Sequence, residues 1–241
     1  MPAARRRRRP RGAVRDGLVA AGLELARTGG PEAVVLREAT RMVGVVPNAA
    51  YRHFADRDEL LAAVCSAAMR ELAGRMAAGV ARVPGGYGDP VAARLRLGAV
   101  GTAYLEFARE EPGLFATAFA VPQQHAYGAA AAAGSGAGSG AAAAAGSGAR
   151  SDAGSGTRSG AGSGEAPAER MPLDYLRAAL DELVDAGVLS PGRREGLEYP
   201  IWSTVHGLAV LAGPGPLRDV PGATRDHLEL LTLGFINESL G

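Results

Sequence analysis

Apolar residues recur at intervals of three and four along most of the chain, which is the spacing of amphipathic helices. A first stripe of this kind consists of Val14, Leu18, Ala21 and Leu25. The run Gly29-Gly30-Pro31 follows it and is a strong helix breaker. The pattern therefore predicts a first helix that ends at these glycines.

Three further helices are predicted directly after this break. A short one runs from about Leu36 and ends at Gly44. Pro47 is well placed to open the next helix, which we expect to continue through Phe54, because proline is favoured at the first helical position. Asp56 is a suitable N-cap for a longer fourth helix.

The same spacing continues in the rest of the chain, and no alternating strand pattern competes with it. The further stripes are Leu97, Val100, Tyr104 and Phe107; Leu114 to Ala120; Leu173, Leu176, Leu180 and Leu183; Trp202, Val205 and Leu208; and the apolar stretch from Thr224 to Leu240. The last of these is apolar on several sides, so it requires a packing partner. The fold class predicted is all-α.

Between these stripes lies a segment of low complexity. Residues 128–164 are almost entirely Gly, Ala and Ser, interrupted only at Arg150, Asp152, Thr157 and Arg158. Such a composition cannot build a core and behaves as a flexible coil. We therefore expect residues 128–166 to be a disordered insertion.

Charge and composition exclude several functions. The formal net charge is +1, but residues 1–15 contain seven arginines and no acid, which predicts a basic arm over residues 1–12. Lysine is absent from the sequence, so a phosphate-binding P-loop and a lysine Schiff base are excluded. No apolar run is long enough to span a membrane, and Cys65 is the single cysteine. The expectation is a soluble cytoplasmic protein without a membrane contact.

No catalytic or metal site is expected. Cys65 falls in an apolar stretch without a neighbouring base, as a small buried residue would. The four histidines do not have the spacing of metal ligands. We therefore expect no enzyme activity, no metal and no cofactor.

A helix ending at Gly44, a tight turn and a short helix with polar and aromatic residues have the order of a helix-turn-helix DNA reader. The stretch from Leu36 to Leu61 resembles the DNA-binding segment of the TetR/AcrR family of one-component regulators. The matching features are Arg37-Glu38, Gly44-Val45, Tyr51-x-His53-Phe54, and Asp56-Arg57 followed by Glu59-Leu60-Leu61. A second motif, Trp202-x-x-x-His206-Gly207, resembles the WHG-type effector domain of one branch of that family.

The resemblance implies a domain organisation. Residues 13–56 are expected to form a three-helix helix-turn-helix domain, and residues 57–241 a helical domain for effector binding and dimerisation. In the family, the last two helices pair with their copies in a second subunit. The apolar final helix of this chain suits such a homodimer.

The expected DNA-binding residues lie on or beside the third helix and at the start of the second. They are Arg37, Pro47, Asn48, Ala49, Tyr51, Arg52, His53 and Arg57. Arg52 is the candidate base reader, because arginine binds guanine O6 and N7 with two hydrogen bonds; the alternative is that it contacts phosphate only. The resemblance places Tyr51 and Arg57 at phosphate-contacting positions, and Arg37 faces the same backbone.

Some residues depart from the family pattern. Val46 stands where a Ser or Thr normally caps the recognition helix, and losing such a cap costs about 0.5–2 kcal/mol. Asn48 is an alternative cap that would shift the helix start. Ala39 is smaller and Val43 larger than the usual residues, and one change can compensate for the other in volume.

Six residues are candidates for an effector pocket. Trp202 and His206 are four apart and share one helical face. Tyr104, Phe107, Phe115 and Phe119 are the candidate walls, and the alternative for each aromatic residue is ordinary core packing. The small-molecule effector itself cannot be named from the sequence.

The function predicted is a ligand-responsive repressor that binds palindromic, double-stranded operator DNA as a homodimer. The alternative is a helical dimeric ligand-binding module whose DNA-binding half has degenerated. Replacing Arg52 by Ala would distinguish the two, because only the first predicts a loss of specific DNA binding.

Overall fold

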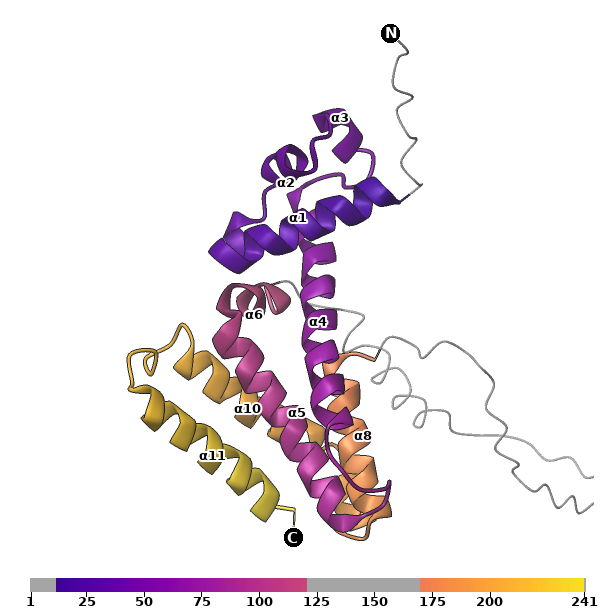
Figure 1. Cartoon of the computed structure of the whole chain (residues 1–241), viewed down its shortest axis with the longest axis vertical. Coiled ribbons are helices and arrows are strands. Elements are labelled where there is room, and N and C mark those ends of the chain that lie inside the picture. Colours follow the sequence, from indigo (N-terminus) through magenta and orange to yellow (C-terminus); the bar gives the residue numbers. More distant parts are fainter. Residues whose placement is uncertain (1–11, 121–169, 241) are drawn as a thin grey trace, which may run out of the picture. The chain divides into compact units, whose positions relative to one another are not determined.

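A computed structural model of the chain describes residues 12–120 and 170–240. Its helices are α1 (Ala13–Gly29), the short 3₁₀ helix η1 (Pro31–Ala33), α2 (Leu36–Val43), α3 (Pro47–Ala50), α4 (Arg57–Ala81), α5 (Pro90–Glu110), α6 (Pro112–Ala118), α8 (Pro172–Asp185), α9 (Pro191–Arg194), α10 (Glu198–Ala212) and α11 (Gly222–Glu238) (Figure 1). The described residues contain no strand, so the all-α prediction is confirmed for them.

The stop and start signals of the first helices are where the sequence predicts them. α1 ends at Gly29, and Gly30 follows with a positive φ of 65°. α2 ends before Gly44, and the Asp56 side chain caps α4 by accepting a hydrogen bond of 2.9 Å from the Glu59 amide. These ends position α2 and α3 next to each other.

Three local predictions need correction. The helix expected to continue through Phe54 ends at Ala50, and residues 51–53 form a turn closed by a hydrogen bond of 2.8 Å from the His53 amide to the Ala50 carbonyl. The helix starts at Pro47, not beyond it, so Asn48 is inside the helix and does not cap it. The two short proline-initiated helices, η1 and α9, were not predicted.

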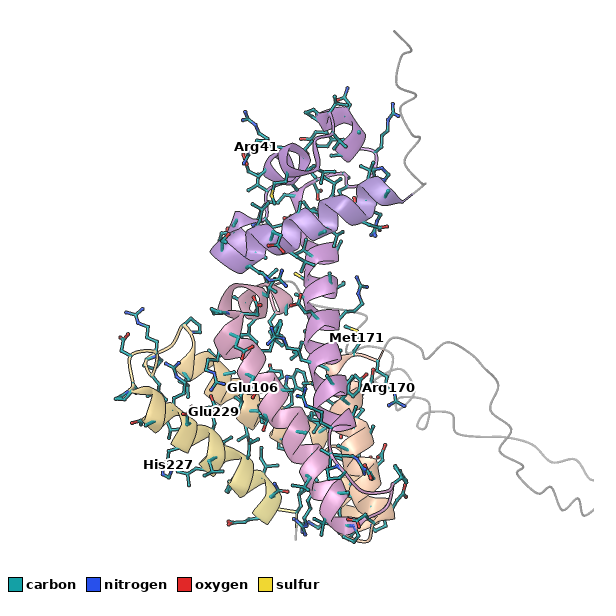
Figure 2. The ribbon with its side chains drawn as sticks, viewed as in Figure 1. Arg41, Glu106, Arg170, Met171, His227 and Glu229 are labelled. Carbon is teal, nitrogen blue, oxygen red and sulfur yellow. The ribbon has the colours of Figure 1, made fainter. Side chains whose placement is uncertain are left out.

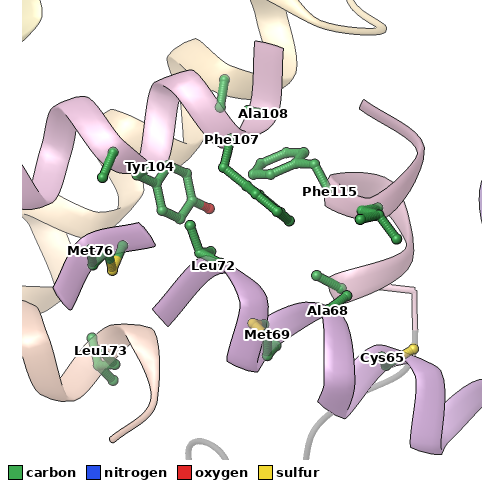
Figure 3. Close-up of a cluster of buried hydrophobic side chains, with 14 of the residues drawn as sticks. Cys65, Ala68, Met69, Leu72, Met76, Tyr104, Phe107, Ala108, Phe115 and Leu173 are labelled. Carbon is green, nitrogen blue, oxygen red and sulfur yellow. The ribbon is translucent and has the colours of Figure 1, made fainter. Parts of the chain in front are cut away.

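The core lies between α4, α5, α6 and α8. Fourteen side chains of this core are drawn in Figure 3, among them Leu72 and Met76 of α4 and Phe107 of α5. All three are at most 1% exposed. Cys65 is also buried, as its apolar sequence context predicts.

Helix α1 is joined to the rest of the fold by ion pairs and by a close contact with α6. The Arg27 guanidinium donates to Glu71 of α4 at 2.8 Å and to Glu111, just before α6, at 3.3 Å. A Cβ atom on Gly113 would lie 2.2 Å from the Ala26 carbonyl oxygen, so only glycine permits this approach of α6 to α1. The three-helix unit is therefore in direct contact with both α4 and α6.

Two predicted segments lie outside the described residues. They are the insertion at 128–166 and the basic arm at 1–12, of which Gly12 alone is described. In the described part of the chain, no helix has the length and apolar character needed to cross a bilayer.

Candidate DNA interface and effector site

The turn between α2 and α3 is built on Gly44. This residue is left-handed, with φ 69° and ψ 38°, a conformation that glycine adopts without steric cost. Its amide donates to the Thr40 carbonyl at 3.1 Å, which closes the end of α2. Val46 is extended and Pro47 begins α3, so only three residues separate the two helices. The geometry is that of a helix-turn-helix.

Most of the predicted DNA-binding residues are exposed around this turn. Arg37, Pro47, Asn48, Tyr51 and Arg52 are exposed, and Ala49 and His53 are half-buried. The Tyr51 side chain is notable, because a tyrosine that is 60% exposed leaves apolar surface in water. The structure thus brings seven of the eight predicted residues to α3, the turn after it and the start of α2.

The eighth residue, Arg57, is engaged within the protein. Its Nε donates to the Val34 carbonyl at 3.0 Å, and its NH2 donates to the Pro31 carbonyl at 2.8 Å. These bonds fix the start of α4 against the segment that precedes α2. A phosphate contact by Arg57 stays a prediction, while its role in positioning α2 is visible.

The structure adds two exposed residues that the sequence did not single out. Arg41 and Met42 are exposed in the last turn of α2, and the Arg41 Nε donates to Glu38 at 2.9 Å. Figure 2 shows Arg41 extending outward from α2. Arg41 lies on the side of α2 away from the buried residues Leu36, Ala39 and Thr40, and Met42 lies at the border of that side, so the helical period was the available signal.

The Val46 and Ala39 departures are accommodated differently. No side chain caps α3 at Val46, so the missing hydroxyl is not replaced. Ala39 is fully buried, and the larger Val43 packs towards α1, where a Cβ atom added to Gly17 would lie 3.4 Å from Val43 Cγ1. The larger side chain of Val43 thus packs against α1 beside Gly17, in the same helix as the smaller Ala39.

Five of the six predicted effector residues form one aromatic cluster. The ring centroid of Tyr104 lies 5.1 Å from that of Trp202 and 5.5 Å from that of Phe115. The ring centroids of Phe119 and His206 are 4.8 Å apart. The Tyr104 hydroxyl is 2.6 Å from His206 Nδ1, which links α5 to α10. We define these residues as the aromatic cluster: Tyr104, Phe115, Phe119, Trp202 and His206.

The sixth residue, Phe107, packs elsewhere. Its side chain is fully buried, and the Arg75 guanidinium of α4 lies 5.1 Å above its ring. In Figure 3, Phe107 lies among the side chains of α4. The structure therefore assigns Phe107 to the α4–α5 core.

The aromatic cluster is densely packed. An apolar pocket beside Tyr104 and Trp202 has a volume of about 30 Å³, which is the space of about one water molecule. Burial lowers the pKa of His206, so its neutral form is favoured. A ligand of the size of an effector would have to open this cluster in order to bind there.

Large apolar side chains are exposed on α10 and α11. On α11, Leu230 is 69% exposed and Phe235 is 65% exposed. On α10, Val210 and Leu211 are also exposed. Several large apolar side chains exposed on two helices that pack together are typical of an interaction surface in soluble proteins.

Comparisons with known proteins agree with the helix-turn-helix geometry. Residues 18–64 match the model of a family described as bacterial regulatory proteins, tetR family. Among curated proteins, none matches the sequence.

Two solved structures share the fold over nearly the whole chain. One is a protein of unknown function from Rhodococcus sp. RHA1, with 22% identity, 97% of this chain and 99% of that chain covered, and a TM-score of 0.63. The other is a candidate TetR-family transcriptional regulator from Rhodococcus sp., with 15% identity, 93% of this chain and 99% of that chain covered, and a TM-score of 0.52. At such identities the likeness shows the fold alone. The family match and the turn geometry together identify residues 18–64 as a TetR-family DNA-binding domain.

Proposed function

We propose that this chain is a sequence-specific DNA-binding transcriptional repressor that acts as a homodimer on a palindromic operator and releases it when a small effector binds. The observation that carries the proposal is the short helix α3 after a left-handed Gly44, with Arg52 and Tyr51 exposed beside it. The proposal assigns the protein no catalytic role and places it in the cytoplasm, where its DNA is.

Contacts with DNA divide into two kinds in this proposal. Arg52 reads a guanine edge in the major groove, since its guanidinium is exposed beside the recognition helix. Arg37, Tyr51 and Arg57 hold the phosphate backbone and set the register. Arg41 is a further phosphate-binding candidate, because it extends from the same unit.

The exposed apolar residues of α10 and α11 support the homodimer. Leu230, Leu231 and Phe235 lie within two turns of α11 and are all more than half exposed. A second copy of the same surface would bury them in a two-fold symmetric contact. Such a dimer carries two copies of α3, which suits an operator with two half-sites.

The aromatic cluster supports the response to an effector. It joins α5, α6 and α10, and α6 in turn contacts α1 through Gly113. A ligand that opens the cluster would favour a conformation in which α1 and the recognition helix are displaced. DNA and effector affinities then weaken each other by the same factor.

The second candidate function is a dimeric ligand-binding module that no longer reads DNA. The observation in its favour is α3 itself, which has only four residues and lacks a side-chain cap at Val46. Selection of duplexes from a random library distinguishes the two functions. The repressor predicts enrichment of a two-fold symmetric motif with half-sites about 34 Å apart or more. A selection that enriches no motif would overturn the repressor and favour the module.

A further inference from the structure

A second pocket lies between α5, α10 and α11, and it does not include any member of the aromatic cluster. Its volume is about 220 Å³, compared with about 30 Å³ for the pocket beside Tyr104. One wall is apolar and consists of Leu105, Ala108, Leu208, Ala209 and Ala212. These apolar side chains can pack against the non-polar part of a ligand.

The polar lining residues carry three guanidinium groups and one carboxylate: Arg109, Arg218, Arg225 and Glu229. Figure 2 shows Glu229 on α11, at the side that faces α5. Arginine is suited to planar anions, because its fork of N–H donors matches a carboxylate. Arg218 already donates to Asp219 at 3.3 Å, so Arg109 and Arg225 are the candidate donors for a negatively charged ligand.

The donors of these polar lining residues are incompletely used. The Arg225 Nε is buried and has no hydrogen-bond partner among the described residues, although Arg225 NH2 donates to the Arg218 carbonyl at 2.8 Å. The Arg109 NH1 lies 3.5 Å from Asp226 and 3.6 Å from Glu229. Charge-assisted hydrogen bonds are usually about 2.7–2.9 Å long, so both pairs are loose. The Arg225 Nε is therefore a buried donor that an acceptor entering the pocket can reach without displacing a protein partner.

The acidic neighbours do not exclude an anion. Asp226 and Glu106 also lie close to Glu229, and burial raises the pKa of Glu229. The Arg109 and Arg225 guanidinium groups oppose this shift, so both arginines act on the same side of the pocket as Glu229.

We propose that this pocket binds a small carboxylic acid with an apolar tail. Its carboxylate accepts hydrogen bonds from Arg225 Nε and Arg109, and its tail lies on Ala108, Leu208 and Ala212. At about 220 Å³ the pocket has room for a short-chain carboxylic acid. Hexanoate has this size and charge.

The pocket also has a structural connection to the DNA-binding domain. Pro112, the first residue of α6, lines it, and the next residue, Gly113, packs on the Ala26 carbonyl of α1. A ligand that moves Pro112 therefore moves the contact between α6 and α1. This coupling rests on the proposed function, whereas the binding site itself does not.

Isothermal titration calorimetry of the full chain with hexanoate tests the site. We expect one hexanoate per protomer, with hexanamide at least about tenfold weaker because it lacks the charge. Arg225→Gln should weaken hexanoate by at least about tenfold. Ala212→Leu, which fills the apolar wall without removing a charge, should do the same.

Arg82→Gln is the matched control, because Arg82 is an exposed arginine at the end of α4 and does not line the pocket. It should leave hexanoate affinity within about twofold. Thermal unfolding of each variant verifies that it is folded. The proposal is overturned if hexanoate does not bind the wild type, if Arg225→Gln binds it as tightly, or if hexanamide binds equally well.

The coupling is measured separately, as the affinity of a selected duplex with and without hexanoate. A weaker affinity in hexanoate supports the connection through Pro112. An unchanged affinity overturns the coupling while the calorimetry still establishes the site. A chain that selects no duplex overturns the proposed function, and the calorimetric result is unaffected.

Discussion

Two arginines of the DNA-binding domain have different surroundings. Arg57 donates to the carbonyls of Pro31 and Val34 and so helps to hold the segment before α2 in place. Arg52 is exposed in the turn after α3, with its guanidinium available to a groove or a phosphate. Their difference makes Arg52 the residue whose removal tests DNA reading without loss of an internal hydrogen bond.

Replacing Arg52 by Ala should weaken binding to the operator by about 1–3 kcal/mol and leave binding to shuffled DNA almost unchanged. Fluorescence anisotropy on both duplexes measures this. Arg82→Ala removes an exposed arginine at the end of α4 and is the control. An equal loss on both duplexes would show that Arg52 contacts phosphate only.

His206 makes stability depend on pH. Burial lowers its pKa, so the folded protein binds a proton less readily than the unfolded chain does. The stabilisation is therefore complete above about pH 6.5, the ordinary value, and is lost as the pH falls through the lower pKa of the folded state. Between about pH 7 and pH 5, the free energy of unfolding of the wild type should decrease more steeply than that of His206→Gln. Urea titrations at both pH values measure it, and parallel decreases would contradict the assignment.

At the scale of elements, helix ends follow from local chemistry. Gly29-Gly30-Pro31 ends α1 and Asp56 caps α4, and both were predictable because a helix end depends on the residues beside it. The end of α3 at Ala50 was not predicted, because no glycine or proline follows Ala50 to mark it. Its N-terminus lacks a side-chain cap at Val46, and after Ala50 the chain turns.

The periodicity of apolar residues also does not predict which helices contact one another when they are far apart in the sequence. Tyr104 and His206 are 102 residues apart, and a stripe shows which face of a helix is buried but not which helix covers it. Phe107 illustrates the point, since it shares a predicted stripe with Tyr104 but packs under Arg75. Trp202 and His206 were selected from a family resemblance, and Tyr104, Phe115 and Phe119 as aromatic residues of the preceding helices.

The contact of α6 with α1 is tight at Gly113. Gly113→Ala should destabilise the protein by about 1–3 kcal/mol, because its Cβ would lie 2.2 Å from the Ala26 carbonyl oxygen. Gly74→Ala in α4 is the control, since a Cβ there meets nothing within 4 Å. That change should stabilise α4 by about 0.5–1 kcal/mol. Thermal unfolding compares the two, and equal melting temperatures would mean that α6 has room to shift.

At the scale of the whole molecule, the dimer depends on surface that one chain leaves exposed. Phe235→Glu places a charge on the exposed apolar face of α11. We expect it to shift the protein from dimer to monomer, because burying one phenylalanine contributes about 1.5–3 kcal/mol. Sedimentation velocity measures the shift. Met42→Glu, which places the same charge at an exposed apolar position of α2, should leave the dimer intact. A Phe235→Glu variant that remains dimeric would place the interface elsewhere.

The central claim is sequence-specific DNA binding, and fluorescence anisotropy tests it most directly. Duplexes tiled from the region upstream of the gene are compared with shuffled duplexes at two salt concentrations. The account predicts that one tile is bound at least about 10³-fold more tightly than its shuffled control, with the preference persisting at the higher salt. Binding of equal strength to the shuffled duplexes and to every tile and selected duplex, lost at the higher salt, would contradict it.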